Sequence, residues 1–215
     1  MSGRIVADDA AGRVAAIEVL RAGGIVALPT DTVYGIAVAL DTPGGIERLF
    51  QVKRRPLDKG IALLVDDASQ AASIGVMGPA ATALAEACWP GGLTIVVPRR
   101  PDRPLPTALT GGAPTIGLRV PAHRTPRSLA RAVGPLPTTS ANLSGWPEAR
   151  DAAAILDQLG KGVDLVLDGG VAHGGPPSTV VDCHGELPVV VREGAITAEH
   201  VAAILRAAGL ELGVR

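Results

Sequence analysis

Hydroxyl, amide and cationic side chains gather in five short clusters, each beside an apolar run of the chain. They occupy residues 29–35, 53–60, 115–121, 137–145 and the paired segments 177–182 and 189–194. Arginine can grip two oxygens of a phosphate or carboxylate, lysine supplies a point charge, and hydroxyls with backbone N–H groups can cradle an anion. Because α/β sheets place ligands at strand ends, these clusters predict a site for an anionic ligand.

Each cluster also has an ordinary structural explanation. The segments 29–35 and 137–145 are typical of capping turns, and the four cations between residues 53 and 59 could form a solvated helix end. Thr115, Gly117 and Arg119 would share one face of a strand, where a buried arginine needs a partner. That partner could be a ligand's carboxylate or phosphate, or an internal aspartate, and the residues alone leave both open.

Several common catalytic motifs are missing from the sequence. It contains no P-loop, no G-x-G-x-x-G after a strand, no C-x-x-C, no H-E-x-x-H and no convincing nucleophile elbow. The four histidines (His123, His173, His184 and His200) do not pair at metal-ligand spacing, and Cys183 beside His184 is typical of a core cysteine next to a surface histidine. We therefore expect neither a protein metal site nor covalent catalysis.

The composition favours a folded cytoplasmic protein. Of 215 residues, 47% are hydrophobic and 19% charged, which is typical of a globular chain. A net charge of −1 argues against a wholly nucleic-acid-binding surface but permits a local basic cleft. Two cysteines far apart in sequence indicate a reducing compartment, and we expect neither a signal peptide nor a membrane-spanning segment.

The order of elements predicts an α/β (α+β) fold with a mixed sheet and a single domain over residues 1–215. Periodicity and capping predict helices over residues 8–22, 43–53, 79–89, 125–133, 151–159 and 197–208, with Thr125 and Thr197 as N-caps. Strands are expected over 25–28, 61–65, 93–97, 115–120, 163–167, 178–182 and 188–192, with another before residue 140. The Pro/Gly-rich segments 99–114 and 169–177 are expected to be loops.

Taken in order, the motifs P-T-D-T-V-Y-G, K-R-R-P-L-D-K-G, W-P-G-G-L-T, T-I-G-L-R-V-P, T-S-A-N-L-S-G, P-S-T-V-V-D and V-R-E-G resemble the YrdC-like family of threonylcarbamoyl-AMP synthases. The resemblance runs from about residue 23 to residue 196. It implies a twisted mixed sheet with flanking helices and an open basic cavity. It also implies a nucleotidyltransferase that converts L-threonine, bicarbonate and ATP, with Mg²⁺, to threonylcarbamoyl-AMP and pyrophosphate. Other proteins of the threonylcarbamoyl-transfer machinery would then modify tRNA.

The same resemblance implies roles for individual residues. Those expected to bind threonine are Thr32, Tyr34, Arg119, Thr138 and Ser178. The K-x-R element supplies Lys53 and Arg55 as catalytic, ATP-binding residues, and the S-x-N element supplies Ser140 and Asn142 for ATP and its magnesium. Lys59, Thr115 and Arg192 would complete the nucleotide site. Positioning and charge neutralisation would then supply most of the catalysis.

The chain departs from the family pattern at two points, and other functions stay open. Leu64 stands where many relatives have histidine, and residues 146–149 read W-P-E-A where S-P-T is common. The main alternative is a non-catalytic module that binds double-stranded RNA or tRNA. A carbamoyltransferase like those of hydrogenase maturation is less favoured because this chain has no acylphosphatase or zinc-finger region, and a scaffold would leave the clustered cations without a purpose.

Overall fold

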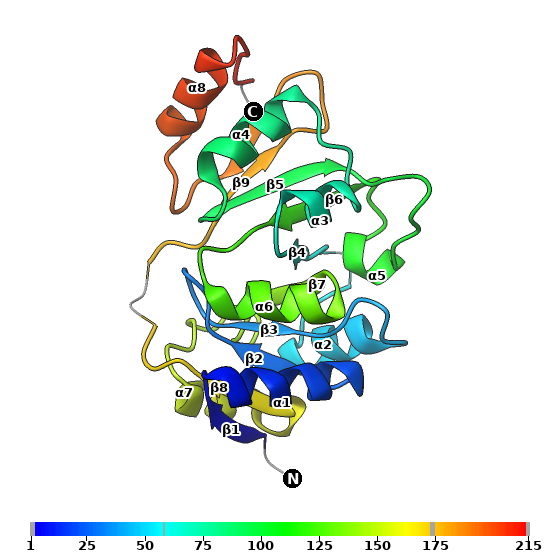
Figure 1. Cartoon of the computed structure of the whole chain (residues 1–215), viewed down its shortest axis with the longest axis vertical. Coiled ribbons are helices and arrows are strands. Elements are labelled where there is room, and N and C mark those ends of the chain that lie inside the picture. The colour runs from blue at the N-terminus through cyan, green and yellow to red at the C-terminus, as the bar shows by residue number, and fades with distance from the viewer. Residues whose placement is uncertain (1–2, 58, 173–174, 214–215) are drawn as a thin grey trace.

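The computed structural model describes residues 3–57, 59–172 and 175–213, and within them the strands form one long mixed sheet (Figure 1). The strands are β1 (Arg4–Ala7), β2 (Val26–Leu28), β3 (Gly35–Ala37), β4 (Ala62–Leu64), β5 (Leu93–Pro98), β6 (Thr115–Arg119), β7 (Leu136–Ser140), β8 (Leu165–Asp168), β9 (Thr179–Asp182) and β10 (Val189–Arg192). The helices are α1 (Ala10–Arg21), α2 (Gly45–Lys53), α3 (Ala68–Ala72), α4 (Pro79–Cys88), α5 (Thr107–Thr110), α6 (Arg124–Val133), α7 (Ala152–Leu159) and α8 (Ala198–Ala207), with a 3₁₀ turn η1 at Gly160–Gly162.

The strand order is β1-β8-β2-β3-β7-β4-β6-β5-β9-β10. The pairs β1–β8, β8–β2, β4–β6 and β5–β9 are parallel, and the other neighbours are antiparallel. Strands that are distant in sequence thus meet at the middle of the sheet, where β7 pairs with both β3 and β4. The mixed α/β sheet expected from the sequence is confirmed.

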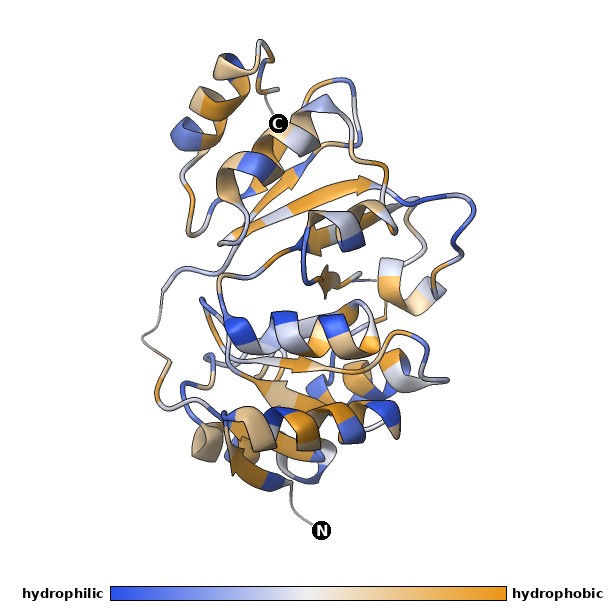
Figure 2. Ribbon diagram, in the orientation of Figure 1, coloured by the Kyte–Doolittle hydropathy of each residue, from blue (hydrophilic) through white to orange (hydrophobic). Residues whose placement is uncertain are grey.

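Two apolar layers cover the sheet. On one face, Leu63, Ile95 and Leu118 of the central strands belong to the larger core, which also contains side chains of α2, α4, α7 and α8. On the other face, α1 and α6 pack against the β8, β2, β7 and β4 region through a smaller core that includes Leu20, Leu129 and Leu136. Figure 2 shows the apolar colouring concentrated in the strands, with hydrophilic residues along the outer sides of the helices. The second face is thus only partly covered by helices.

The predicted elements are largely present, and the differences have local causes. Sequence reasoning missed the short strands β1 and β3, the helix α3, and the helix α5, which interrupts the predicted loop 99–114. Thr125 was wrongly expected to cap α6: the N-cap is His123, whose Nδ1 accepts from the Thr125 backbone N–H at 3.2 Å. The Thr125 hydroxyl is buried and instead donates to the Asp8 carboxylate at 2.6 Å. Thr197 does cap the final helix, as predicted.

In the described part of the chain, no helix is both long and apolar enough to cross a membrane. Asp58 of the second cluster, and His173 with part of the predicted loop 169–177, lie outside the described residues.

Thr179 at the start of β9 ties the last two elements to the sheet. Its side chain is fully buried, and its Oγ1 accepts from the backbone N–H groups of Gly194 and Ile196, each at 2.9 Å. Replacing the hydroxyl by a methyl group would leave both partly buried donors without their acceptor, and the Ile196 carbonyl without its donor.

We therefore expect Thr179→Val to lower the free energy of unfolding by about 2–4 kcal/mol, measured by urea denaturation. Thr179→Ser keeps the oxygen and loses only a methyl group, so it should cost about 1 kcal/mol. Equal losses in the two variants would contradict the bonding role of the hydroxyl.

Candidate functional site

A cavity of about 480 Å³ lies on the same face of the sheet as α1 and α6, beyond the region that these helices cover. The central strands line it with Ala62 and Leu64 of β4, Thr94 and Val96 of β5, Thr115, Ile116, Gly117 and Arg119 of β6, and Thr138, Thr139 and Ser140 of β7. Most of these residues alternate along their strands, because successive side chains point to opposite faces of a sheet. A Cβ added at Gly117 would lie 3.3 Å from the Thr94 methyl carbon, so the absence of a side chain at Gly117 leaves space in the cavity.

Arg119 is the most buried cation of the cavity lining. Its guanidinium donates to Asp31 Oδ1 at 2.7 Å, Thr32 Oγ1 at 3.1 Å and the Gly91 carbonyl at 3.0 Å. Burial lowers the pKa of Arg119 and the Asp31 charge raises it, but an arginine so paired stays protonated. The sequence left two partners open for Arg119, a ligand's anion or an internal aspartate. The structure shows the aspartate, Asp31, and Arg119 also lines the cavity, where a ligand could reach it.

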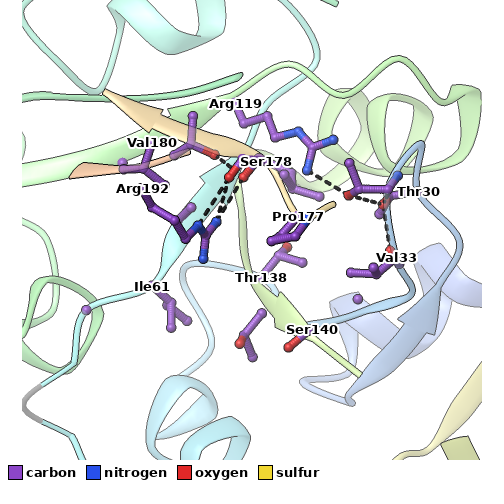
Figure 3. Close-up of a pocket in the computed structure, with 18 of the residues that line it drawn as sticks. Thr30, Val33, Ile61, Arg119, Thr138, Ser140, Pro177, Ser178, Val180 and Arg192 are labelled. Atoms are coloured by element: carbon purple, nitrogen blue, oxygen red, sulfur yellow. Dashed lines mark hydrogen bonds between the residues drawn. The ribbon is translucent and has the colours of Figure 1, made fainter. Parts of the chain in front are cut away.

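The turn after β2 is held by its own hydroxyls. Thr30 Oγ1 donates to the Val33 carbonyl at 2.6 Å and accepts from the Thr32 backbone N–H at 3.1 Å. This turn brings Asp31 and Thr32 to Arg119, so the P-T-D-T segment and the arginine of β6 form one unit (Figure 3).

Ser178 connects two further elements at the cavity wall. Its Oγ lies 2.8 Å from Thr94 Oγ1, and its carbonyl accepts from Arg192 Nη2 at 2.8 Å. Figure 3 shows Ser178 between the side chains of Arg119 and Arg192. Two guanidinium groups therefore approach the cavity beside a hydroxyl pair, which is an arrangement suited to carboxylate or phosphate oxygens.

Arg55 reaches the cavity because α2 ends abruptly. Arg54 takes a left-handed conformation with φ of 51°, so the chain reverses immediately after Lys53. The Arg55 guanidinium then lies 5.7 Å from the centre of the Phe50 ring and donates to the carbonyls of Lys59 and Gly60. Arg55 thus lines the cavity beside β4.

Tyr34 lines the cavity, but its hydroxyl is occupied by the backbone. The hydroxyl donates to the Gly170 carbonyl at 2.7 Å and accepts from the Gly169 N–H at 3.0 Å. Burial raises the pKa of Tyr34. The side chain is only 1% exposed and packs in the larger core, and its oxygen anchors the segment that leaves β8.

The structure brings most of the predicted site residues together. Those that line the cavity are Thr32, Tyr34, Arg55, Thr115, Arg119, Thr138, Ser140, Ser178 and Arg192. Lys53, Lys59 and Asn142 do not line it: Lys59 is exposed, whereas Lys53 and Asn142 are buried. The pKa of Lys53 is lowered to about 8, first by burial and then by the neighbouring Arg55 charge, while the Glu148 charge acts in the opposite direction.

Among the site residues that sequence reasoning did not assign are Asp31, Thr94 and Glu148. Asp31 is foreseen only as an unspecified internal aspartate, and Thr94 carries the signal of a polar residue inside the apolar strand 93–97. Glu148 is the single carboxylate in the lining formed by the described residues, and it lies in the segment where the chain departs from the family pattern. Among the residues with described positions, no group of three His, Cys, Asp or Glu side chains could hold a metal ion.

The open α/β sheet, with arginines and hydroxyls around one cavity and no nucleophile–base pair among the residues that line it, is of the class whose site suits a carboxylate or phosphate compound. The Sua5/YciO/YrdC family model, described as "Telomere recombination", matches residues 18–194. The chain belongs to this family.

Relatives with known names have similar sequences. Threonylcarbamoyl-AMP synthase of Bacillus subtilis is 34% identical over 194 residues, which cover 88% of this chain and 55% of that protein. Threonylcarbamoyl-AMP synthase of Thiobacillus denitrificans is 37% identical over 165 residues, covering 76% of this chain and 86% of the relative. The chain thus spans about half the length of the first relative and most of the second.

Solved structures of the family have the same fold. Sua5 of Pyrococcus abyssi in complex with L-threonine superposes with a TM-score of 0.86 at 30% identity, over 98% of this chain and 61% of that one. YciO of Escherichia coli superposes with a TM-score of 0.81 at 29% identity, over 92% and 97% of the two chains. The twisted sheet expected from the resemblance is therefore confirmed.

The Asp31–Arg119 pair gives a prediction about stability. Both side chains are largely buried, so removing one partner leaves a charge with little access to water. We expect Asp31→Ala to lower the free energy of unfolding by about 2–4 kcal/mol, measured by chemical denaturation. The double variant Asp31→Ala with Arg119→Met should recover part of this loss, because no unpaired charge is left behind. Additive losses would show that the pair is not coupled.

Proposed function

We propose that the chain, acting as one domain over residues 1–215, is a threonylcarbamoyl-AMP synthase. It would convert L-threonine, bicarbonate and ATP to threonylcarbamoyl-AMP and pyrophosphate. The observation that carries the proposal is the buried guanidinium of Arg119 at a hydroxyl-lined cavity that also receives Arg55 and Arg192. Family membership and the names of the relatives support the same reaction.

In this proposal Arg119 binds the carboxylate of threonine. Thr32, Thr138 and Ser178 line the cavity and offer hydroxyls to the amino acid's polar groups, and Tyr34 also borders the cavity. Leu64, which pairs with Arg119 across β4 and β6, contributes an apolar surface near the carboxylate position. Sua5 of Pyrococcus abyssi, which shares this fold, forms a complex with L-threonine, and that complex supports the assignment.

The nucleotide occupies the other part of the cavity. Arg55 and Arg192 supply charge for the phosphates, and Thr115 and Ser140 supply hydroxyls. The described residues offer no carboxylate cage for magnesium, so the ion fits this chain only as a companion of ATP, held mostly by phosphate oxygens with Glu148 and Ser140 nearby. Bound there, Mg²⁺ would neutralise phosphate charge.

The reaction asks little covalent chemistry of the protein. The threonine nitrogen attacks a carbon dioxide equivalent from bicarbonate to form a carbamate, and a carbamate oxygen attacks the α-phosphorus and expels pyrophosphate. Arg119 would orient the amino acid, while Arg55 and Arg192 would stabilise charge on the phosphates. The lining needs no nucleophile for this sequence of steps.

The product is an activated group carrier. We infer that it serves threonylcarbamoyladenosine formation in tRNA, together with the proteins that transfer the group, and that the reaction takes place in the cytoplasm, where ATP and tRNA are present. Direct contact of this chain with RNA is a separate property, since a basic cavity of this kind could also receive phosphates of a nucleic acid.

The proposal is tested by pyrophosphate release from the purified protein with ATP, Mg²⁺ and bicarbonate, with and without L-threonine. We expect threonine-dependent release, and a loss of about 10²-fold or more in kcat/KM for threonine in Arg119→Ala, because a charge-assisted contact disappears.

The matched control is Arg206→Ala, which removes an exposed arginine of α8 and should leave the rate unchanged. Absence of threonine-dependent release from the folded wild type would sink the synthase assignment. If that protein still bound double-stranded RNA in a salt-dependent way, the non-catalytic RNA-binding module would be favoured instead.

A further inference from the structure

The ammonium group of Lys53 is buried and bonded to backbone carbonyls. The side chain is only 2% exposed, and its Nζ donates to the carbonyl of Ser140 and, at 2.6 Å, to the carbonyl of Asn142. Asn142 Oδ1 lies 3.3 Å from the same nitrogen. In return, the backbone N–H of Ser144 donates to the Lys53 carbonyl at 2.9 Å. The end of α2 is thus bonded in both directions to the segment that follows β7.

Asn142 completes this arrangement from within the segment. Its Nδ2 donates to the carbonyl of Leu143 at 3.0 Å and to the carbonyl of Trp146 at 2.6 Å, while its Oδ1 faces Lys53. The amide therefore uses its donors and its acceptor to fix the backbone between residues 142 and 146. We call residues 140–148 the 140–148 turn.

The two ends of the 140–148 turn face the cavity. Ser140 lines it at the start of the turn and Glu148 lines it at the end, whereas Lys53 and Asn142 lie outside the lining. For Lys53 to reach a phosphate, its ammonium would have to leave two carbonyl groups that then lack their donor, and such a loss is costly in a buried setting.

We propose that Lys53 and Asn142 are positioning residues, which hold the 140–148 turn so that Ser140 and Glu148 face the nucleotide. They do not themselves contact its phosphates. The inference rests on the proposed function for the identity of the ligand. It gives the two residues of each motif different roles: Arg55 of K-x-R and Ser140 of S-x-N face the nucleotide, while Lys53 and Asn142 hold the backbone beside them. The lowered pKa of Lys53 agrees with an ammonium surrounded by protein rather than water.

The two tryptophans allow a test without nucleotide or turnover. Trp146 belongs to the turn and is 59% exposed, whereas Trp89 lies at the end of α4 and donates to the Leu93 carbonyl. Protein labelled with 5-fluorotryptophan should therefore give two ¹⁹F resonances, and the Trp89 resonance serves as an internal reference for folding.

In the nucleotide-free protein, Lys53→Met and Asn142→Ala should each move or broaden the Trp146 resonance and leave that of Trp89 unchanged. Arg55→Met is the matched control, because it removes a neighbouring cation that faces the cavity. It should weaken ATP binding while the Trp146 resonance stays in place. Lys53→Arg, which keeps a charged donor, should restore part of the wild-type signal.

ATP affinity, measured by calorimetry, gives the second readout. We expect about a tenfold or greater loss in each single variant and no further loss in the double variant Lys53→Met with Asn142→Ala, because both act through one turn. A Trp146 resonance unchanged by Lys53→Met, together with multiplying affinity losses, would overturn the proposal in favour of direct phosphate contact by Lys53.

These outcomes separate the inference from the proposed function. The ¹⁹F signals of the nucleotide-free protein do not depend on synthase activity, so a protein that binds ATP without releasing pyrophosphate still decides the role of Lys53. If Lys53→Met fails to fold, as judged by loss of the Trp89 resonance, Asn142→Ala tests the same turn with the lysine intact.

Discussion

The site depends on an uneven covering of the sheet. Leu63, Ile95 and Leu118 point to the larger core on one face, so their neighbours along each strand must point to the other face. There α1 and α6 cover only the region around β8, β2, β7 and β4, and the alternate residues beyond them are left around a cavity. The cavity is therefore a consequence of where the helices stop, and the register of β4 to β7 decides which side chains it receives.

A polar cavity wall must be stable before a ligand arrives. No buried side-chain nitrogen or oxygen among the described residues lacks a hydrogen-bond partner. Arg119 is paired with Asp31 and Thr32, and Ser178 with Thr94 and Arg192. A ligand therefore exchanges partners instead of filling vacant ones, which limits the net gain from each contact. The compensation is geometric, because the guanidinium groups are already held in place by the protein and little side-chain freedom is lost on binding.

The elements that could be predicted from the sequence are those with strong local signals. The apolar strand 93–97 and the capped helix begun by Thr197 were predicted because periodicity and capping are local. The three-residue strand β3 could not be seen, since it is very short and one of its two partners, β7, lies about a hundred positions away. Thr125 has the residue type of an N-cap, but a tertiary contact with Asp8 takes its hydroxyl, so the cap moves to His123. Of the site, the lining strands were readable, whereas the partner of Arg119 required the fold.

The basic cluster at residues 53–55 shows why charge patterns alone do not assign roles. Lys53 closes α2, Arg54 turns left-handed, and Arg55 leaves on a different side, so two cations separated by one residue enter different environments. Lys53 meets backbone carbonyls in the interior, where an ammonium is tolerated because those oxygens replace its water. Arg55 stays beside the cavity, where its planar group can share oxygens with a ligand. Two cations that read as one phosphate-binding element in the sequence are thus separated by a single backbone reversal, with Lys53 in the interior and Arg55 beside the cavity.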